Sequence, residues 1–426
     1  MKALVIGGAL SGTAAAYLLN KNGFDVTVVS NSDFDSRLDL EAKGIHVVLS
    51  DADTSDYDDA VVVVKNPGIP NSHPLVKRFE NIINEIELAV RANPLGRYYA
   101  ISGTNGKTTS THMLHEMLLK KDKYALLAGN VGIPLSQKIY EDGNLERDIA
   151  LEISAFQMEG TPQFEPKIYA LLNLTPDHLD RYDSEKEYYQ AKLDIIPRSK
   201  IFIRNIDDEN ISKLTKNIEH KSIINISLNT KADAYIEDDI AYYKGLALFD
   251  TRKLKVVGKH NVYNALFAAV MAYLAHVKVS DIQDVLYSFT GIAHRLEFVK
   301  EVKGVRYYND SKATNPESTE VALKAFDKNI ILLAGGFDKH ISFDLLKPYL
   351  EKIKSVYLFG ESKDQLKEIF QDGILVDDLD TALALAEKEA IKGDVVLLSP
   401  ACASYDQFKN FEERGDHFKS LVSKIK

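Results

Sequence analysis

Cysteine is almost missing from this sequence of 426 residues, which contains only Cys402. A single cysteine excludes a disulfide framework and a cysteine metal cluster, and it fits a reducing compartment. No apolar stretch approaches the roughly 20 residues that span a bilayer. No charged region with a cleavage site precedes the first strand pattern, so we expect no signal peptide. These absences together predict a cytoplasmic protein without a membrane span.

The sequence also has fewer basic than acidic residues. Its formal net charge is −10, and no run of basic residues offsets it. This balance argues against a nucleic-acid surface, whereas a few local cations can still bind small acidic molecules. The chain is long enough for two or three domains, each with its own core. We expect a monomer that binds small molecules.

Strand patterns alternate with helical patterns along the whole chain, which predicts an α/β fold with ligands at the carboxyl ends of parallel strands. The polar, β-rich stretch 222–257 predicts antiparallel hairpins, and a helix is expected from Asn261 to about His276. Boundaries near 93 and 292 divide the chain into three domains. They are a Rossmann-like N-terminal domain (1–93), a central phosphate-loop-type mononucleotide-binding α/β domain (94–292) and a C-terminal Rossmann-like α/β domain (293–426).

The most specific motif is Ser-Gly-Thr-Asn-Gly-Lys-Thr-Thr at 102–109, between an apolar strand pattern and a helical pattern that starts near Lys107. A glycine-bearing turn that opens a helix points backbone N–H groups and the helix dipole at one spot, which suits a polyphosphate. Lys107 adds a charge, and the Thr108 hydroxyl can reach the metal that accompanies ATP. Ile101 occupies the position of the first glycine of the general phosphate loop, so this loop is a variant.

The turn Gly7–Gly12 resembles a dinucleotide-binding fingerprint with Ala9 at the middle glycine. A tight strand-to-helix turn without a ligand is the alternative. Ser30 and Asn31 stand where an acidic residue would hold the ribose of NAD, which argues against that cofactor. A nucleotide-linked substrate with its diphosphate at the helix N-terminus fits better.

Two further residues in the central domain, Glu152 and His178, could serve a metal. Glu152 ends an apolar strand pattern and could hold Mg²⁺, or it could face solvent. His178 could ligate a metal or cap a turn, and its neighbours Asp177 and Asp180 could be helix caps. Lys192 lies on a helical stretch, where a lysine is normally a solvated surface group.

The C-terminal domain contains two loops rich in small and hydrogen-bonding residues, at 309–315 and 399–408, and Lys339 marks a third strand end. Each alone could be ordinary turn chemistry. Three polar loops at the strand ends of one sheet are better explained by a site for a polar ligand that carries carboxylates. Cys402, with no histidine nearby in sequence, is interpreted as a packed small residue.

In order and spacing these motifs resemble the Mur ligases of peptidoglycan synthesis over essentially the whole chain. The resemblance depends on the 102–109 loop, the Glu152 strand, Asp177-His178, Lys192, Gly-Lys-His-Asn-Val-Tyr-Asn at 258–264 and His294-Arg295. The loops Asn-Asp-Ser-Lys-Ala-Thr-Asn (309–315) and Ser-Pro-Ala-Cys-Ala-Ser-Tyr-Asp-Gln-Phe (399–408) resemble the branch that adds D-glutamate. Folylpolyglutamate-type ligation and a nucleotide-binding regulatory protein without catalysis remain alternatives.

The resemblance implies ATP, UDP-N-acetylmuramoyl-L-alanine and D-glutamate as substrates, joined through an acyl phosphate. It implies that Lys107 neutralises the transferring phosphoryl group, and that Thr108 and Glu152 hold one Mg²⁺. A second Mg²⁺ would be served by His178 and by Lys192, the latter as an N6-carboxylated lysine. A carbamate supplies the anionic oxygen that a hard metal prefers.

The remaining roles that the resemblance implies are contacts with the three substrates. ATP would contact Gly103, Thr104, Asn105, Gly106, Lys107, Thr108, Thr109, Asn261, Asn264, Arg295 and, at its ribose, Asp310. The UDP-linked substrate would contact Leu10, Ser11 and Gly12 at its diphosphate, and Asn130 and Ser154 at its muramoyl part. D-glutamate would contact Lys312, Thr314, Lys339, Ser404 and Phe411. Where the family often reads uracil with an acid and a threonine, this sequence has Ser30 and Asn31.

Overall fold

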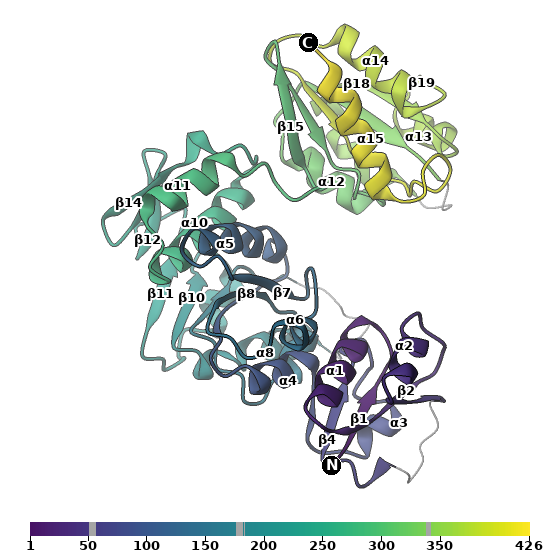
Figure 1. Ribbon diagram of the computed structural model, residues 1–426. Coiled ribbons are helices and arrows are strands. Elements are labelled where there is room, and N and C mark those ends of the chain that lie inside the picture. The colour runs from purple at the N-terminus through teal and green to yellow at the C-terminus, as the bar shows by residue number, and fades with distance from the viewer. Residues whose placement is uncertain (51–56, 176–181, 183, 338–341) are drawn as a thin grey trace. The chain divides into compact units, whose positions relative to one another are not determined.

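A computed structural model describes residues 1–50, 57–175, 182, 184–337 and 342–426. The chain divides into two compact units, one made of Met1–Thr251 with Tyr263–Val285 and the other of Arg252–Val262 with Leu286–Lys426. Three sheets follow one another along the chain, two in the first unit and the third in the second (Figure 1). The α/β class predicted from the sequence is confirmed. The boundaries near 93 and 292 stay predictions, and the three sheets fall on either side of them.

The first sheet consists of five strands, and all its neighbouring pairs are parallel. In spatial order they are β3 (His46–Leu49), β2 (Asp25–Ser30), β1 (Lys2–Ile6), β4 (Val62–Lys65) and β5 (Ile82–Ile83). The central strand β1 is buried after its first residue, as its apolar run indicates. Its carboxyl end leads into the Gly7–Gly12 turn and helix α1 (Leu10–Lys21).

That turn requires glycine because α1 packs closely on it. A Cβ atom on Gly12 would lie 1.8 Å from the carbonyl oxygen of Gly7, which no side chain can occupy. The hydroxyl of Thr13 donates to the Gly8 carbonyl at 2.9 Å and fixes the turn from the helix side. The glycines therefore have a packing role that is independent of any ligand.

The second sheet has nine strands and forms the centre of the first unit. In spatial order they are β14 (Leu246–Asp250), β13 (Ile240–Tyr243), β12 (Ala234–Glu237), β11 (Ile223–Ile226), β10 (Ile201–Asn205), β9 (Ile168–Leu171), β6 (Arg97–Ser102), β8 (Asp148–Glu152) and β7 (Leu126–Gly129). From β7 to β12 the pairs are parallel, so the carboxyl ends of β6, β8 and β9 meet at one edge. The predicted hairpins begin only at β12, because β11 pairs in parallel with both of its neighbours.

Helices connect most of these strands. Those before residue 290 are α1, α2 (Arg37–Ala42), α3 (Pro74–Lys77), α4 (Glu85–Ala92), α5 (Lys107–Lys121), α6 (Leu135–Asp142), α7 (Ala155–Glu159), α8 (Glu185–Leu193), α9 (Glu209–Leu214), α10 (Lys259–Leu274) and α11 (Val279–Ser288). Short 3-10 helices follow α8 at Ile196–Arg198 and β14 at Thr251–Lys253. The helix predicted from Asn261 is α10. No helix in the described part of the chain is long and apolar enough to cross a membrane.

The third sheet belongs to the second unit and has six strands. In spatial order they are β15 (Glu297–Val302), β16 (Val305–Asn309), β20 (Val395–Leu398), β17 (Ile330–Gly335), β18 (Ile353–Phe359) and β19 (Ile374–Leu375). Its helices are α12 (Pro316–Lys324), the 3-10 helix Asp344–Lys352, α13 (Lys363–Ile369), α14 (Leu379–Glu389) and α15 (Phe411–Lys424). An apolar cluster covers each face of this sheet.

Buried apolar runs mark β17, β18 and β20, and the polar loop at 309–315 implies a strand before it, which is β16. The sequence did not predict β15, which pairs with β16 as a hairpin. Strand β15 lies at the edge of the sheet and is only half-buried, so its charged residues interrupt the apolar pattern that marks a buried strand. Strand β19 has only two residues, Ile374 and Leu375, and both are exposed.

Helices α4 and α6 are joined by a buried carboxylate in the first unit. Oε2 of Glu85 accepts a hydrogen bond from the backbone N–H of Ser136 in the first turn of α6 at 2.9 Å, and the Ser136 hydroxyl donates to the Glu85 carbonyl. The other carboxylate oxygen, Oε1, is buried and has no hydrogen-bond partner in the described residues. Burial raises the pKa of Glu85 to about 7.

This shift predicts a pH-dependent contribution to stability. Because the folded state binds a proton at Glu85 more tightly than the unfolded state, stability should fall as pH rises from about 4.5 to about 7, by about 3 kcal/mol. Replacing Glu85 by Gln keeps the site neutral, so the loss of stability between pH 5 and pH 8 should be smaller in that variant. Urea unfolding at both pH values measures it, with Glu165→Gln at an exposed position of the same unit as control. Equal pH dependence in the wild type and both variants would contradict the assignment.

Candidate functional site

The loop predicted to bind phosphate connects the end of β6 to the start of α5, as the sequence indicated. Gly106 is the N-cap of α5 in the left-handed conformation, with φ of 81°, and no side chain caps the helix there. The first N–H groups of α5 therefore remain available to an anion at the positive end of the helix. Ile101, at the position of the missing first glycine, is buried inside β6.

The segment after β9 holds this loop in place. The Asn105 backbone N–H donates to Oδ1 of Asn173 at 2.8 Å, and Nδ2 of Asn173 donates back to the Asn105 carbonyl at 3.0 Å. The Thr104 hydroxyl donates to the Thr175 carbonyl at 3.0 Å and accepts from the Thr175 N–H. The loop is thus preorganised by hydrogen bonds, which lowers the cost of ordering it around a ligand.

Two lysines converge on one carbonyl oxygen of the loop. Nζ of Lys107 lies 2.9 Å and Nζ of Lys192 lies 3.2 Å from the carbonyl oxygen of Gly103. Lys192 is only 1% exposed, and its amine lies 4.8 Å from the centre of the Tyr188 ring. The alternative that Lys192 is a solvated surface lysine is therefore wrong.

Glu152 lies at the carboxyl end of β8, next to β6, and is 2% exposed, so the solvent-facing alternative is also wrong. Its Oε1 accepts a hydrogen bond from Nδ2 of Asn130 at 2.8 Å. Its Oε2 is buried and has no hydrogen-bond partner in the described residues. A buried carboxylate oxygen without a donor is costly, and a cation would compensate for it. The residues present fit the predicted magnesium ion.

The hydroxyl-bearing Thr108 and Thr109 lie in the first turn of α5 and are partly exposed. His178, the other predicted metal ligand, lies outside the described residues together with Asp177 and Asp180. Among the residues that are described, no group of three or more histidines, cysteines, aspartates or glutamates gathers in a way that could hold a metal. The fit to a metal therefore depends on Glu152.

Asn264 on α10 packs against the phosphate loop within the first unit. Its Oδ1 accepts from the Ser110 hydroxyl at 3.2 Å, and a Cβ atom on Gly106 would lie 2.3 Å from the same oxygen. Asn261 belongs to the second unit, where its Nδ2 donates to the Val257 carbonyl at 2.7 Å. Only Asn264 is thus placed beside the loop.

The predicted contacts for the UDP-linked substrate are spread over two sheets of the first unit. Leu10 is exposed, Ser11 is half-buried and Gly12 is buried at the start of α1. Ser154 is the N-cap of α7 in a capping box with Gln157, directly after β8. Asn130 is held by Glu152, so a substrate at Asn130 would lie next to the candidate metal ligand.

In the second unit, Asp310 follows β16 and is buried. Its Oδ2 accepts from the Ser399 hydroxyl at 2.7 Å, and its Oδ1 accepts from the Leu296 N–H at 3.0 Å. Burial raises the pKa of Asp310 to about 7. The bond to Leu296 fixes the turn that presents the exposed Arg295.

The remaining described residues predicted for this unit lie on the loops after β16 and β20 and at the start of α15. Nζ of Lys312 lies 5.6 Å from the centre of the Phe411 ring, so those two residues are close together. Thr314 lies two residues further along the same loop and is half-buried, and Ser404 follows β20 and is buried. Lys339 lies outside the described residues. The expectation that Cys402 is a packed residue is confirmed, since it is 2% exposed and its sulfur lies 3.0 Å from the Ser362 hydroxyl.

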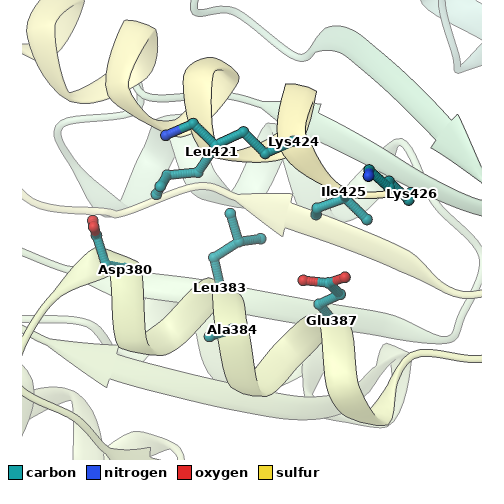
Figure 2. A pocket seen from close by; sticks show the side chains of 8 residues that line it. All are labelled: Asp380, Leu383, Ala384, Glu387, Leu421, Lys424, Ile425 and Lys426. Carbon is teal, nitrogen blue, oxygen red and sulfur yellow. The ribbon is translucent and has the colours of Figure 1, made fainter.

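A surface groove of about 440 Å³ lies elsewhere in the same unit, between α14 and α15. Figure 2 shows Leu383 on α14 facing Leu421 and Ile425, with acidic side chains on α14 and lysines on the opposite side. None of its lining residues is a predicted site residue. The groove is therefore not part of the candidate active site.

Sequence reasoning missed Asn173 and Arg414. Asn173 follows β9 at the same edge as the phosphate loop, and that position could have identified it. Arg414 gives no such signal, because it lies within helix α15, and an arginine on a helix ordinarily faces solvent.

The fold and the phosphate loop define a nucleotide-phosphate-binding α/β protein. The Mur ligase middle domain matches residues 101–272, and the Mur ligase glutamate ligase domain matches residues 294–402. The chain is 38% identical to a relative from Geobacillus sp. (strain WCH70) over 100% of this chain and 98% of that protein, and 38% identical to one from Bacillus subtilis (strain 168) over 99% and 97%. Both relatives are named UDP-N-acetylmuramoylalanine–D-glutamate ligase. The chain belongs to the Mur ligase family.

Solved structures agree with the fold. The UDP-N-acetylmuramate-alanine ligase of Thermotoga maritima matches with a TM-score of 0.57 at 20% identity, over 100% of both chains. A pseudomurein peptide ligase of Methanothermus fervidus matches with a TM-score of 0.55 at 17% identity, again over 100% of both. At this identity the likeness shows a shared architecture.

The geometry of the loop predicts that Gly106→Ala weakens ATP binding by about tenfold or more, because its Cβ would collide with Asn264. Gly23→Ala is the control, since Gly23 has a similar positive φ of 82° at the end of a helix but nothing lies within 4 Å of the added atom. Titration calorimetry with Mg-ATP measures both. Equal affinities in the two variants would contradict the steric explanation.

Proposed function

We propose that this chain is an ATP-dependent ligase that joins D-glutamate to UDP-N-acetylmuramoyl-L-alanine in peptidoglycan precursor synthesis, releasing ADP and phosphate. The observation that carries the proposal is the phosphate loop of β6–α5 beside the buried Glu152, whose Oε2 has no hydrogen-bond donor among the residues that the structure describes. The full-length relatives named for this reaction support it, and they favour it over folylpolyglutamate-type ligation.

The reaction that we propose has two steps. A carboxylate oxygen of the acceptor attacks the γ-phosphorus of ATP, the bond to the β-phosphate oxygen breaks, and ADP leaves. The deprotonated amine of D-glutamate then attacks the acyl carbon, the carbon–oxygen bond to phosphate breaks from the tetrahedral intermediate, and phosphate leaves. Both steps bring anions together, so the site must offset negative charge.

Lys107 and the first turn of α5 are placed to do this. The helix N–H groups would cradle the phosphates, and the Lys107 amine would stay beside the γ-phosphoryl group as it moves. Thr108 and Glu152 would hold one Mg²⁺, which would neutralise phosphate charge. A regulatory nucleotide-binding protein has no need of this buried carboxylate.

Lys192 suits a second role, as an N6-carboxylated ligand together with His178. An amine must be uncharged to add to carbon dioxide, and burial disfavours the ammonium form. The Lys107 amine shares the Gly103 carbonyl with Lys192, so conversion of Lys192 to an anion would also remove a repulsion between two cations.

Substrate binding completes the proposal. Asn264, Asn261, Arg295 and Asp310 would contact ATP, and the lysines of the C-terminal loops would pair with the carboxylates of D-glutamate. Asn130 and Ser154 would contact the muramoyl part, and the α1 turn the diphosphate. The use of ATP and a nucleotide-linked precursor favours the cytoplasm, and we propose a monomer.

Phosphate release from Mg-ATP tests the reaction. Release should require UDP-N-acetylmuramoyl-L-alanine and D-glutamate together, and L-glutamate should not substitute, because a site built on fixed loops is chiral. A steady-state phosphate assay with each substrate omitted in turn measures this. Release that is indifferent to D-glutamate would rule the proposal out.

The carbamate makes a separate prediction. Lys192→Ala should lower kcat by about a hundredfold or more, without rescue by added bicarbonate, whereas Lys186→Ala at an exposed position of the same helix should be nearly neutral. In the wild type, isotope-labelled bicarbonate should give a carbamate carbon signal by NMR that is missing from Lys192→Ala. Near-normal turnover in Lys192→Ala would exclude the carbamate.

A further inference from the structure

Arg414, in the first turns of α15, is a fully buried cation of the second unit, with an exposed fraction of 0%. This position is unfavourable for the helix itself, because a cation near a helix N-terminus opposes the dipole. It is also costly to desolvate, since a buried charge needs partners. Its presence therefore calls for an explanation outside helix stability.

The hydrogen bonds of its guanidinium connect three separate loops. Nε donates to the Ser311 hydroxyl at 2.9 Å, and Nη2 donates to the carbonyls of Ser311 at 2.9 Å and Cys402 at 3.0 Å. Nη1 donates to the Ala403 carbonyl at 3.2 Å and, more weakly, to the Gly335 carbonyl at 3.5 Å. These acceptors lie at the carboxyl ends of β16, β20 and β17, which are adjacent strands of one sheet.

These are the loops on which the sequence placed the site for an acidic amino acid. Ser311 directly precedes Lys312, and its hydroxyl also donates to the carbonyl of Phe411, whose ring lies beneath the Lys312 amine. Ala403 directly precedes Ser404. In a trans peptide the N–H points opposite to the C=O, so turning the Ala403 carbonyl toward Arg414 turns the Ser404 N–H away from it.

The charge of Arg414 is not cancelled by direct contact. All five hydrogen bonds end on neutral oxygens, and burial lowers its pKa to about 10, so it stays charged at neutral pH. Two acids interact electrostatically with Arg414, Asp406 and Asp310. Burial disfavours the charged form of both, since it raises the pKa of Asp406 and raises that of Asp310 to about 7. The loops therefore surround a positive charge that favours an anionic ligand.

We propose that Arg414 is a positioning residue for the acidic amino acid substrate: it ties three loops into one binding surface and gives that surface a positive potential. The inference rests on the proposed function for the identity of that amino acid. A planar guanidinium can hold several carbonyls in fixed directions at once, which an ammonium cannot do, so lysine should not replace it.

Steady-state kinetics of the full chain tests the role. Arg414→Lys should raise KM for D-glutamate by about tenfold or more while KM for ATP and for UDP-N-acetylmuramoyl-L-alanine stays within about twofold. Replacing a residue that serves only general stability would change all three KM values together or none of them. Arg306→Lys is the control. Arg306 lies near the start of β16, away from the loop that follows the carboxyl end of that strand, so this variant should leave all three KM values unchanged.

Ser311→Ala provides a gentler variant in case the Arg414 variants do not fold. It removes one acceptor of the guanidinium and should raise KM for D-glutamate by about threefold or more, with the other KM values unchanged. An unchanged KM for D-glutamate in folded Arg414→Lys, or in Ser311→Ala if Arg414→Lys does not fold, would overturn the positioning role. Failure of the proposed function is seen separately, as a wild-type protein that does not require D-glutamate.

Discussion

Hydrogen bonds from lysine and arginine side chains to backbone carbonyls are the interaction on which both candidate sites depend. In the first unit the amines of Lys107 and Lys192 meet at the Gly103 carbonyl, at the turn of the phosphate loop. In the second unit Arg414 holds the carbonyls of three loops. In each case a polar group that is costly to bury is stabilised by hydrogen bonds to peptide carbonyls, and those peptides are fixed in return.

The parallel sheets make this arrangement effective. Because neighbouring parallel strands end at the same edge, short loops after β6, β8 and β9 come together without long connections, and so do those after β16, β17 and β20. The buried Glu152 and Asp310 then lie where a strand ends and a polar ligand can be reached. The same topology thus accounts for both proposed sites, the nucleotide site in one unit and the acidic amino-acid site in the other.

The two sites differ in what their buried carboxyl groups can do. Glu152 has an oxygen without a hydrogen-bond donor in the described part of the chain, which is an arrangement that suits a cation. Both oxygens of Asp310 accept hydrogen bonds, from Ser399 and Leu296, so its role in the free protein is to fix the turn beside Arg295. The first carboxylate is available to a ligand, and the second organises the residues that would meet one.

Local sequence by itself determined the α/β class, most of the buried strands and the phosphate loop, because apolar runs, glycine turns and helix starts are signals carried by neighbouring residues. It could not show that Lys192 and Glu152 are buried, that β11 pairs in parallel, or that Arg414 joins three loops. Those facts depend on which segments, distant in the chain, pack against a residue, and burial and pairing of that kind are set only when the sheets assemble.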